Sequence, residues 1–209
     1  MKLVEQLNWR YATKAFNTQK KVSERDIDYL KEAIRLSASS YGLQLYKVLL
    51  VEDKATREAL RPLCWNQSQI TDASHLFVFC HKVEALDQGV DEYLALQSEL
   101  REVEVQKLKG YGDFIKSKLS EINDEQKSQW TSKQTYIAAA NLMVACAELE
   151  IDSCPIEGFE VEKVNALLGL DKQGYSASML IPVGYRSAED KTQHLVKVRR
   201  SNTQLFETI

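Results

Sequence analysis

The side chains that could do chemistry are basic and small polar residues, and they lie in four short segments of the 209-residue chain. These segments are Arg10–Lys14, Ser37–Gln44, Pro155–Gly158 and Lys197–Arg200. Taken one at a time, each has an ordinary explanation as solvated charges, a loop closing a helix, a turn or a charged tail. Any chemistry therefore depends on whether the four segments belong together.

Catalysis by acidic, nucleophilic or metal-bound side chains has no support in the sequence. The chain lacks a P-loop, a Gly-x-Gly-x-x-Gly turn, a Gly-x-Ser-x-Gly nucleophile turn and a His-Glu-x-x-His motif. None of His75, His81 and His194 accompanies a nucleophile or a set of metal ligands. The cysteines form no Cys-x-x-Cys pair, and Cys154 has no basic neighbour in the sequence that would activate its thiol. We expect no metal site and reduced cysteines.

Composition excludes several classes of protein. Hydrophobic residues make up 44% of the chain, which excludes disorder. The 27 Lys and Arg residues against 30 Asp and Glu residues give a net charge of -3, which argues against a nucleic-acid partner. No run of about 20 apolar residues could span a bilayer, and Glu5 stands where a signal peptide needs an apolar block. We expect a cytoplasmic protein with no membrane partner.

Helix and strand patterns alternate along the first half of the chain. Ser23 and Asp26 form a capping-box-like start to a helix with apolar residues at helical spacing. Asp53 is expected to cap a second helix that ends near Pro62. Apolar runs predict buried strands at 46–51, 76–80 and, later in the chain, 176–183.

The second half is predicted to be mostly helical, over 92–108, 125–149 and 161–168. Gly110–Gly112 is expected to interrupt the first of these segments. The stretch 137–146 is apolar on all sides, which predicts a helix buried all round, either between layers of its own chain or against a second subunit. Leu205 and Phe206 are candidate strand residues. Without repeats or linkers, residues 1–209 are predicted to form a single α+β domain.

Five segments stand in one order along the chain: Arg10–Phe16, Ser37–Ser40 with Gln44, Asn66 ahead of Asp72–His75, Pro155–Phe159, and Lys197 with Arg199. Together they resemble motifs of the nitroreductase family of FMN-dependent, NAD(P)H-using oxidoreductases, in particular its oxygen-insensitive nitroreductase and dihydropteridine reductase branch. The first segment is similar to the family's Arg-x-Ser-x-Lys-x-Phe and the second to its Ser-Pro-Ser-Ser…Gln-Pro-Trp. The third is similar to an Asn before Asp-Ala-Ser-His, the fourth to a loop along the flavin, and the fifth to a phosphate clamp. The five together are specific.

The resemblance implies a role toward FMN for each position. Arg10, Lys197 and Arg199 would bind the phosphate, for which cations are suited. Lys14 would stand at the N1–C2=O edge of the flavin, where a fixed cation favours the reduced form. Asn66 would contact the pyrimidine edge, where its amide can both donate and accept.

Further implied contacts come from backbone and small side chains. Ser39 and Ser40 would be contributed by the partner subunit, and backbone N–H groups around Glu157 and Gly158 would point at flavin N5. The remaining members of the implied FMN site are Tyr11, Ala12, Gln69, Pro155 and Ile156.

Departures from the family pattern are expected to affect the affinity for FMN, the reduction potential of the flavin and the preference for an electron acceptor. Ala12 replaces a phosphate-binding Ser, a loss of about 1.5–3 kcal/mol for a hydrogen bond to a charged group. Gln69 replaces a second Lys, which predicts a lower flavin potential. Leu45–Tyr46 replaces Pro-Trp in the pocket region, so acceptor preference does not carry over. Tyr41, and Phe114 or Tyr111, are candidate pocket walls, with a core role for Phe114 equally open.

The implied fold is an α+β sandwich, a mainly antiparallel sheet flanked by helices, in an intertwined homodimer with FMN at the interface. The tail at 205–209 would add a strand to the partner's sheet. The implied activity is ping-pong hydride transfer from NAD(P)H to FMN and then to a small aromatic acceptor, a nitroaromatic, quinone or dihydropteridine. The alternatives are an NAD(P)H:flavin reductase, a flavin-storing or sensing protein without turnover, and a structural module without flavin.

Overall fold

The computed structural model describes residues 2–209, in which four strands form one sheet. They are β1 (Tyr46–Val51), β2 (His75–Lys82), β3 (Asp152–Ser153) and β4 (Tyr175–Gly184). Their spatial order is β1–β2–β4–β3, and each neighbouring pair is antiparallel. The three strands expected from apolar runs and the mainly antiparallel sheet are therefore confirmed.

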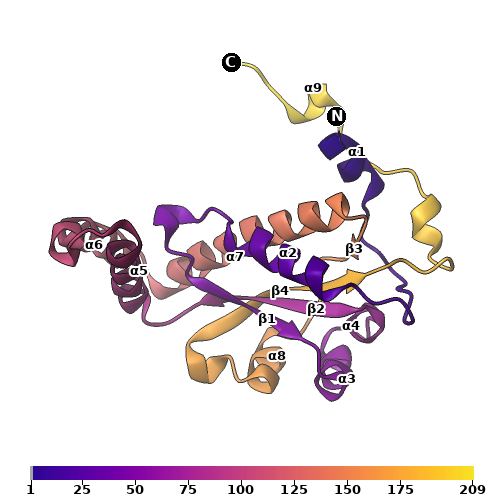
Figure 1. The fold of residues 1–209 in the computed structure, drawn as a ribbon, viewed down its shortest axis with the longest axis horizontal. Helices are drawn as coiled ribbons and strands as arrows, with labels where there is room; N and C mark the ends of the chain where they lie inside the picture. The colour runs from indigo at the N-terminus through magenta and orange to yellow at the C-terminus, as the bar shows by residue number, and fades with distance from the viewer. Residues whose placement is uncertain (1) are drawn as a thin grey trace.

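Helices cover both faces of this sheet (Figure 1). One face carries α2 (Glu24–Arg35) and α7 (Asp124–Glu148). The other carries α3 (Lys54–Leu63), α4 (Gln69–Asp72) and α8 (Val161–Leu168). This arrangement is the helix-flanked α+β sandwich that the resemblance implied.

The position of β2 in the sheet explains the continuous apolar run at residues 76–80. Its side chains alternate between the faces, so that Phe77 and Phe79 pack among the residues of α2 and α7. Leu76, Val78 and Cys80 pack among those of α3, α4 and α8. All five are at most 1% exposed, as expected for a strand covered on both faces.

The helix starts follow the expected caps. Ser23 Oγ accepts the backbone N–H of Asp26 at 3.1 Å, and Asp53 Oδ2 accepts that of Thr56 at 2.7 Å. Helix α3 continues to Leu63, so that Pro62 lies in its last turn rather than beyond it. Both caps are confirmed, and the end of α3 falls close to the expected position.

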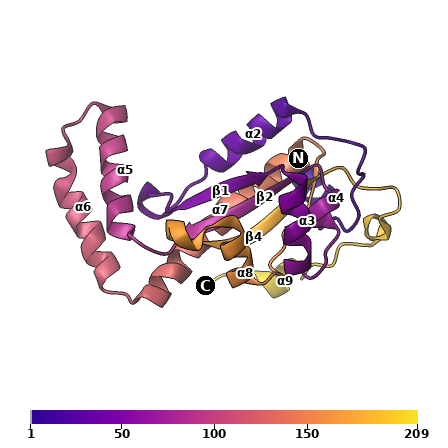
Figure 2. The same ribbon diagram turned by 90° about the horizontal axis from the view of Figure 1, so that it is seen from below.

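Helices α5 (Leu86–Arg101) and α6 (Val105–Ser120) form a hairpin that projects from one end of the sheet (Figures 1 and 2). The expected interruption at Gly110–Gly112 is wrong, because these residues lie within α6. The break comes earlier, at Glu102, which has a left-handed φ of 53°. Gly112 instead permits close packing, since a Cβ atom there would lie 2.4 Å from Leu94 Cδ1 of α5.

Helix α7 is buried on one side only. Ala138, Leu142 and Cys146 are fully buried against the sheet, whereas Tyr136 is 41% exposed and Ile137 43% exposed. The expectation that one chain would bury this helix all round is wrong. The alternative that a second subunit covers it remains a prediction.

The two chain ends add little to the core. Helix α1 (Lys2–Trp9) has no buried residue and lies against α7. The C-terminal tail leaves the body of the molecule and contains one short helix, α9 (Asn202–Leu205) (Figure 1). The expected strand at Leu205 and Phe206 is wrong within this chain, because Ser201 and Gln204 form a capping box that starts a helical turn. No helix within residues 2–209 is long and apolar enough to cross a membrane.

Candidate functional site

The segment Arg10–Phe16 is held against the carboxyl end of β4. Ala12 forms a parallel bridge with Ser153 of β3, and Phe16 forms an antiparallel bridge with Arg186 just beyond β4. Phe16 is buried, so it fixes the segment in the core. The basic residues at either end of the segment are thereby brought to one edge of the sheet.

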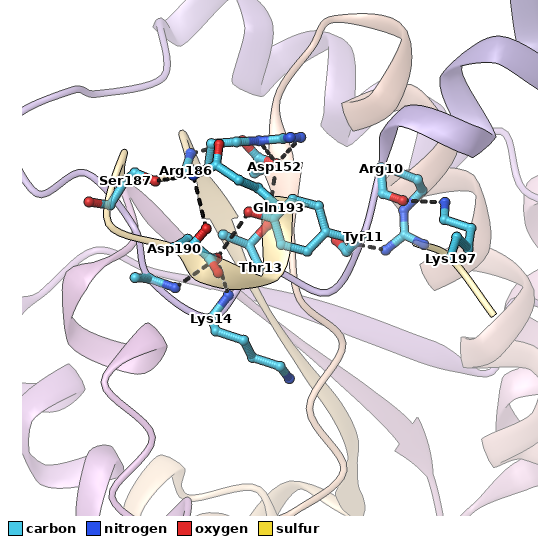
Figure 3. A network of polar contacts seen from close by, with 11 residues as sticks. Arg10, Tyr11, Thr13, Lys14, Asp152, Arg186, Ser187, Asp190, Gln193 and Lys197 are labelled. Atoms are coloured by element: carbon cyan, nitrogen blue, oxygen red, sulfur yellow. Dashed lines mark hydrogen bonds and ion pairs between the residues drawn. The ribbon is translucent and has the colours of Figure 1, made fainter. Parts of the chain in front are cut away.

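Asp190 is the centre of a hydrogen-bond network that fixes this segment (Figure 3). Its carboxylate is 2% exposed and accepts hydrogen bonds from Tyr11 Oη (3.0 Å), Lys14 N (2.7 Å), Ala15 N (3.1 Å) and Thr192 N (2.9 Å). Burial acts to raise the pKa of Asp190, but these four donors outweigh it and hold the pKa below its usual value. The carboxylate therefore stays ionised at neutral pH.

A second buried carboxylate joins the same elements. Asp152 is 3% exposed and accepts Arg186 Nε at 2.9 Å and Thr13 Oγ1 at 3.3 Å. Arg186 Nη2 lies 2.7 Å from Asp152 Oδ1 as an ion pair without the alignment of a hydrogen bond. The Arg186 guanidinium also lies over the rings of Trp9 and Tyr11, at 4.2 and 4.7 Å from their centroids.

The Lys14 side chain leaves this network although its backbone belongs to it (Figure 3). It is exposed, and its ammonium group has no hydrogen-bond or ion-pair partner among residues 2–209. Burial raises the pKa of the nearby Cys154 thiol, whereas the charges of Lys14 and Arg10 and a hydrogen bond with Gln69 act in the opposite direction. Three residues expected at the flavin, Arg10, Lys14 and Gln69, thus lie around Cys154.

Three cations from the two chain ends form a second group. Lys197 Nζ donates to the carbonyl oxygens of Leu7 and Arg10, beside Arg199. Burial lowers the pKa of Lys197, and the charges of Arg10 and Arg199 lower it further. Burial also lowers the pKa of Arg10, whose Nε atom is buried without a partner. None of the three forms an ion pair with a carboxylate within residues 2–209. Cations without such a partner suit an anionic ligand.

The loop after β3 presents free backbone donors. Ile156 exchanges two hydrogen bonds with Leu180, at 2.8 and 3.0 Å, and Gly158 O accepts Gln67 Nε2 at 3.1 Å. The backbone N–H groups of Glu157 and Gly158, which lie between these two attachments, have no partner within the described residues. Two adjacent free N–H groups suit a ligand edge that carries nitrogen and oxygen acceptors.

The turn that carries Asn66 is strained. Trp65 and Asn66 both have left-handed backbones, with φ of 53° and 54°. Trp65 is 71% exposed, and its ring packs so closely on Gly158 that a Cβ atom there would lie 2.6 Å from Trp65 Cε3. Consecutive non-glycine residues in this region are typical of functional sites. The turn places Asn66 beside the loop with the free N–H groups.

Ser39 and Ser40 do not join the cations within one chain. Ser39 Oγ accepts the N–H of Gln44 at 2.9 Å, and Ser40 N donates to Gln134 Oε1 at 2.9 Å. Arg10 instead contacts Met143, at 3.7 Å from its sulfur. Positions 134 and 143 are separated by about 13 Å along α7. Contribution of the two serines by a partner subunit, as the resemblance implied, therefore stays a prediction.

The candidate pocket residues do come together. The Tyr41 ring meets those of Tyr111 and Phe114 edge-on, both at 6.5 Å between centroids, and that of Trp130 at 6.4 Å. Phe114 is 49% exposed, so it is not a core residue of this chain. We call these four residues the aromatic cluster. It lies where the α5–α6 hairpin meets α7.

Sequence reasoning missed Asp152, Arg186 and Asp190. Each binds a residue more than thirty positions away in the chain, and an isolated Asp or Arg in a turn looks like a surface charge. Trp130 was missed for the same reason, because its aromatic neighbours come from two other segments.

Comparison with known proteins identifies the family. The sequence profile of the Nitroreductase family matches residues 7–185. A provisionally named NAD(P)H nitroreductase of Staphylococcus epidermidis is 36% identical over 221 residues, which cover 99% of this chain and 96% of that protein. One of Bacillus subtilis is 34% identical over 195 residues, 88% of each. The chain belongs to the nitroreductase family and is an oxidoreductase by that membership.

Solved structures share the whole fold. A nitroreductase-like protein of Bacillus subtilis superimposes with a TM-score of 0.88 at 19% identity, covering 99% of this chain and 98% of that one. A structure from Exiguobacterium sibiricum, described as a complex with FMN, gives 0.84 at 19% identity and covers 99% and 97% of the two chains. At this identity the likeness shows the nitroreductase fold.

Proposed function

We propose that residues 1–209 form one FMN-binding domain and that the protein is an FMN-dependent NAD(P)H oxidoreductase. The observation that carries the proposal is the group of Arg10, Lys197 and Arg199, three mutually repelling cations without a carboxylate partner in the described chain. Such a group is stable when an anion with two charges lies among it, and the FMN phosphate is such an anion. The FMN-bound relative of the same fold supports this assignment.

The other residues fit the remaining parts of FMN. Bound FMN would supply the chemistry, by accepting hydride from NAD(P)H and passing electrons to an acceptor in a ping-pong sequence. Lys14 would stabilise negative charge at the N1–C2=O edge, since its ammonium group is free of carboxylates. The free N–H groups of Glu157 and Gly158 would donate to the ring, and Asn66 would bind its pyrimidine edge.

The aromatic cluster supports a flat aromatic acceptor. Half-exposed rings such as Tyr41 and Phe114 favour a flat, electron-poor molecule that can stack or meet them edge-on. Nitroaromatics, quinones and dihydropteridines share this property. We place Tyr41 and Phe114 in the substrate pocket on this ground.

The exposed apolar surface supports a homodimer. The chain exposes 12604 Å², against about 9,900 Å² for a compact monomer of this mass. This exposed surface includes apolar side chains of α1, α7 and the tail: Leu3, Val4, Leu7, Ile137, Val196, Val198 and Phe206. A second copy would cover them and could supply Ser39 and Ser40 to the FMN site.

The visible absorption spectrum of the purified protein tests the proposal, recorded before and after anaerobic addition of NADH or NADPH. A flavin spectrum that bleaches is the expected result. A flavin that stays oxidised would favour storage or sensing, and a protein that takes up no added FMN would overturn the proposal. Turnover with a nitroaromatic compared with free flavin then separates a nitroreductase from a flavin reductase.

A further inference from the structure

Tyr136 of α7 donates a hydrogen bond from its hydroxyl to Glu157 Oε1, across 21 positions of the chain. Burial raises the pKa of Tyr136 to about 12, and the contact with Glu157 adds to the shift. The hydroxyl therefore keeps its proton at neutral pH and remains a donor to the carboxylate. This contact links the central helix to the loop with the free N–H groups.

The loop has few other attachments near its centre. Ile156 is fixed by Leu180 on one side, and the carbonyl of Gly158 is fixed by Gln67 on the other. Between them, Tyr136 is the hydrogen-bond partner of the Glu157 side chain within residues 2–209. The Glu157 carbonyl accepts the N–H of Phe159 at 3.0 Å, so residues 157–159 form a tight turn. The Glu157 Cα joins the two peptides that carry the free N–H groups, and the hydrogen bond of its side chain with Tyr136 ties this turn to α7.

We propose that Tyr136 is a positioning residue, which acts through Glu157 to hold the Glu157 and Gly158 N–H groups toward the flavin ring. The inference rests on the proposed function. It adds a contact between α7 and the loop at 157–158 that no sequence motif indicates. In the sequence, Tyr136 stands next to apolar helix residues that predict only a packing role. The hydroxyl does not touch the cofactor in this role, and it moves no proton.

A matched pair elsewhere on the molecule provides the control. Tyr29 Oη donates to Glu148 Oε2 at 2.8 Å, between α2 and the end of the same helix α7. It is 46% exposed, close to the 41% of Tyr136, and it contacts none of the residues assigned to FMN. The substitution Tyr29→Phe removes the same atom from the same kind of pair.

The test compares Tyr136→Phe, Glu157→Gln and the double variant with the FMN-loaded wild type. We expect Tyr136→Phe to slow anaerobic flavin reduction at saturating NAD(P)H by about tenfold, a loss of 1.36 kcal/mol in transition-state stabilisation. The half-saturating NAD(P)H concentration should change less than about twofold, because the variant alters the hydrogen bonds to the flavin ring and not the binding of NAD(P)H. FMN content and melting temperature should match the wild type, since the three cations proposed to bind the FMN phosphate are unchanged.

The glutamine variant separates positioning from charge. Its amide oxygen still accepts the Tyr136 hydroxyl, so Glu157→Gln should reduce flavin faster than Tyr136→Phe does. The double variant should be no slower than Tyr136→Phe alone, because both changes act through one contact. Tyr29→Phe should reduce flavin at the wild-type rate.

Each contrary result has a distinct meaning. If Tyr136→Phe reduces flavin at the wild-type rate with an unchanged flavin spectrum, the positioning role is wrong while the proposed function stands. If Tyr136→Phe loses FMN and melts several degrees lower, the contact is an ordinary structural one and the inference also fails. If the wild type binds no FMN, both the inference and the proposed function are overturned.

Discussion

Arg199 and Arg200 are neighbours with the same side chain in different surroundings. Arg199 lies close enough to Arg10 and Lys197 to lower the pKa of both, whereas no such contact involves Arg200. The Arg199 side chain bonds only to the carbonyl of Val198, at 2.7 Å, and is otherwise exposed. We therefore expect its charge to matter for the proposed anion site and hardly for folding.

The substitution Arg199→Ala tests this difference. Loss of one charged hydrogen-bond donor to phosphate should weaken FMN binding by about 1.5–3 kcal/mol, which is roughly tenfold to a hundredfold in Kd. The melting temperature of the apoprotein should not change. Fluorescence titration with FMN gives Kd, and Arg200→Ala is the matched control. Equal FMN affinity in the two variants would contradict the assignment of Arg199 to the phosphate.

Single residues also show what the sequence could and could not reveal. The cations Arg10, Lys14, Lys197 and Arg199 stand in short segments that resemble family motifs, and this resemblance selected them. Their anchor, Asp190, could not be found this way, because three of its four hydrogen-bond donors belong to the distant segment Arg10–Phe16. Residues in local motifs can be predicted from a sequence, whereas the partner of a buried charge depends on which segments the fold brings together.

At the scale of elements, Asp190 joins the N-terminal segment to the chain that follows β4. Because its folded pKa is depressed, the carboxylate stabilises the native state fully above the unfolded value of about 3.9. That contribution is lost as the pH falls through the lower folded pKa. The attachment of the N-terminal segment through Asp190 should therefore be stable at neutral pH and weaken in acid.

Asp190→Asn should destabilise the protein by about 1–3 kcal/mol at pH 7, because it replaces an ionised acceptor of four hydrogen bonds with a neutral amide. The difference in unfolding free energy between wild type and variant should shrink as the pH falls below about 4. Urea unfolding at pH 7 and at pH 3.5 measures both values. A difference that stays constant or grows in acid would show that Asp190 is not the charged anchor described above.

The same scale explains which elements were predictable. The caps at Ser23 and Asp53 are local hydrogen bonds, so the starts of α2 and α3 followed from the sequence. The interruption expected at Gly112 was wrong because that glycine serves contact with Leu94 on a neighbouring helix, which periodicity within one segment cannot register. The helix starts fixed by local caps were predicted correctly, whereas the role of Gly112, which is set by packing between two helices, was not.

At the scale of the whole molecule, the exposed face of α7 bears on whether the protein acts as a monomer or as a dimer. Ile137 lies on this face beside Tyr136 and is 43% exposed. Ser39 and Ser40, which the resemblance assigns to the FMN site of the partner, form hydrogen bonds with Gln44 and Gln134 of their own chain. Burial of an apolar side chain of the size of Ile137 contributes about 1.5–3 kcal/mol. A C2 interface would repeat the contact, because the same patch occurs in both copies.

The substitution Ile137→Asp should therefore give a monomer, since it buries an unpaired carboxylate twice in each dimer. Because Ser39 and Ser40 would then be missing from each site, the monomer should also retain less FMN than the wild type. Size-exclusion chromatography with light scattering gives the mass, and absorbance gives the flavin content of the same peak. Leu167→Asp on α8 is the matched control, because Leu167 is also 43% exposed but lies on the opposite face of the sheet. A monomeric Ile137→Asp protein with full flavin content would mean that each chain builds a complete site alone, and an unchanged dimer would place the interface elsewhere.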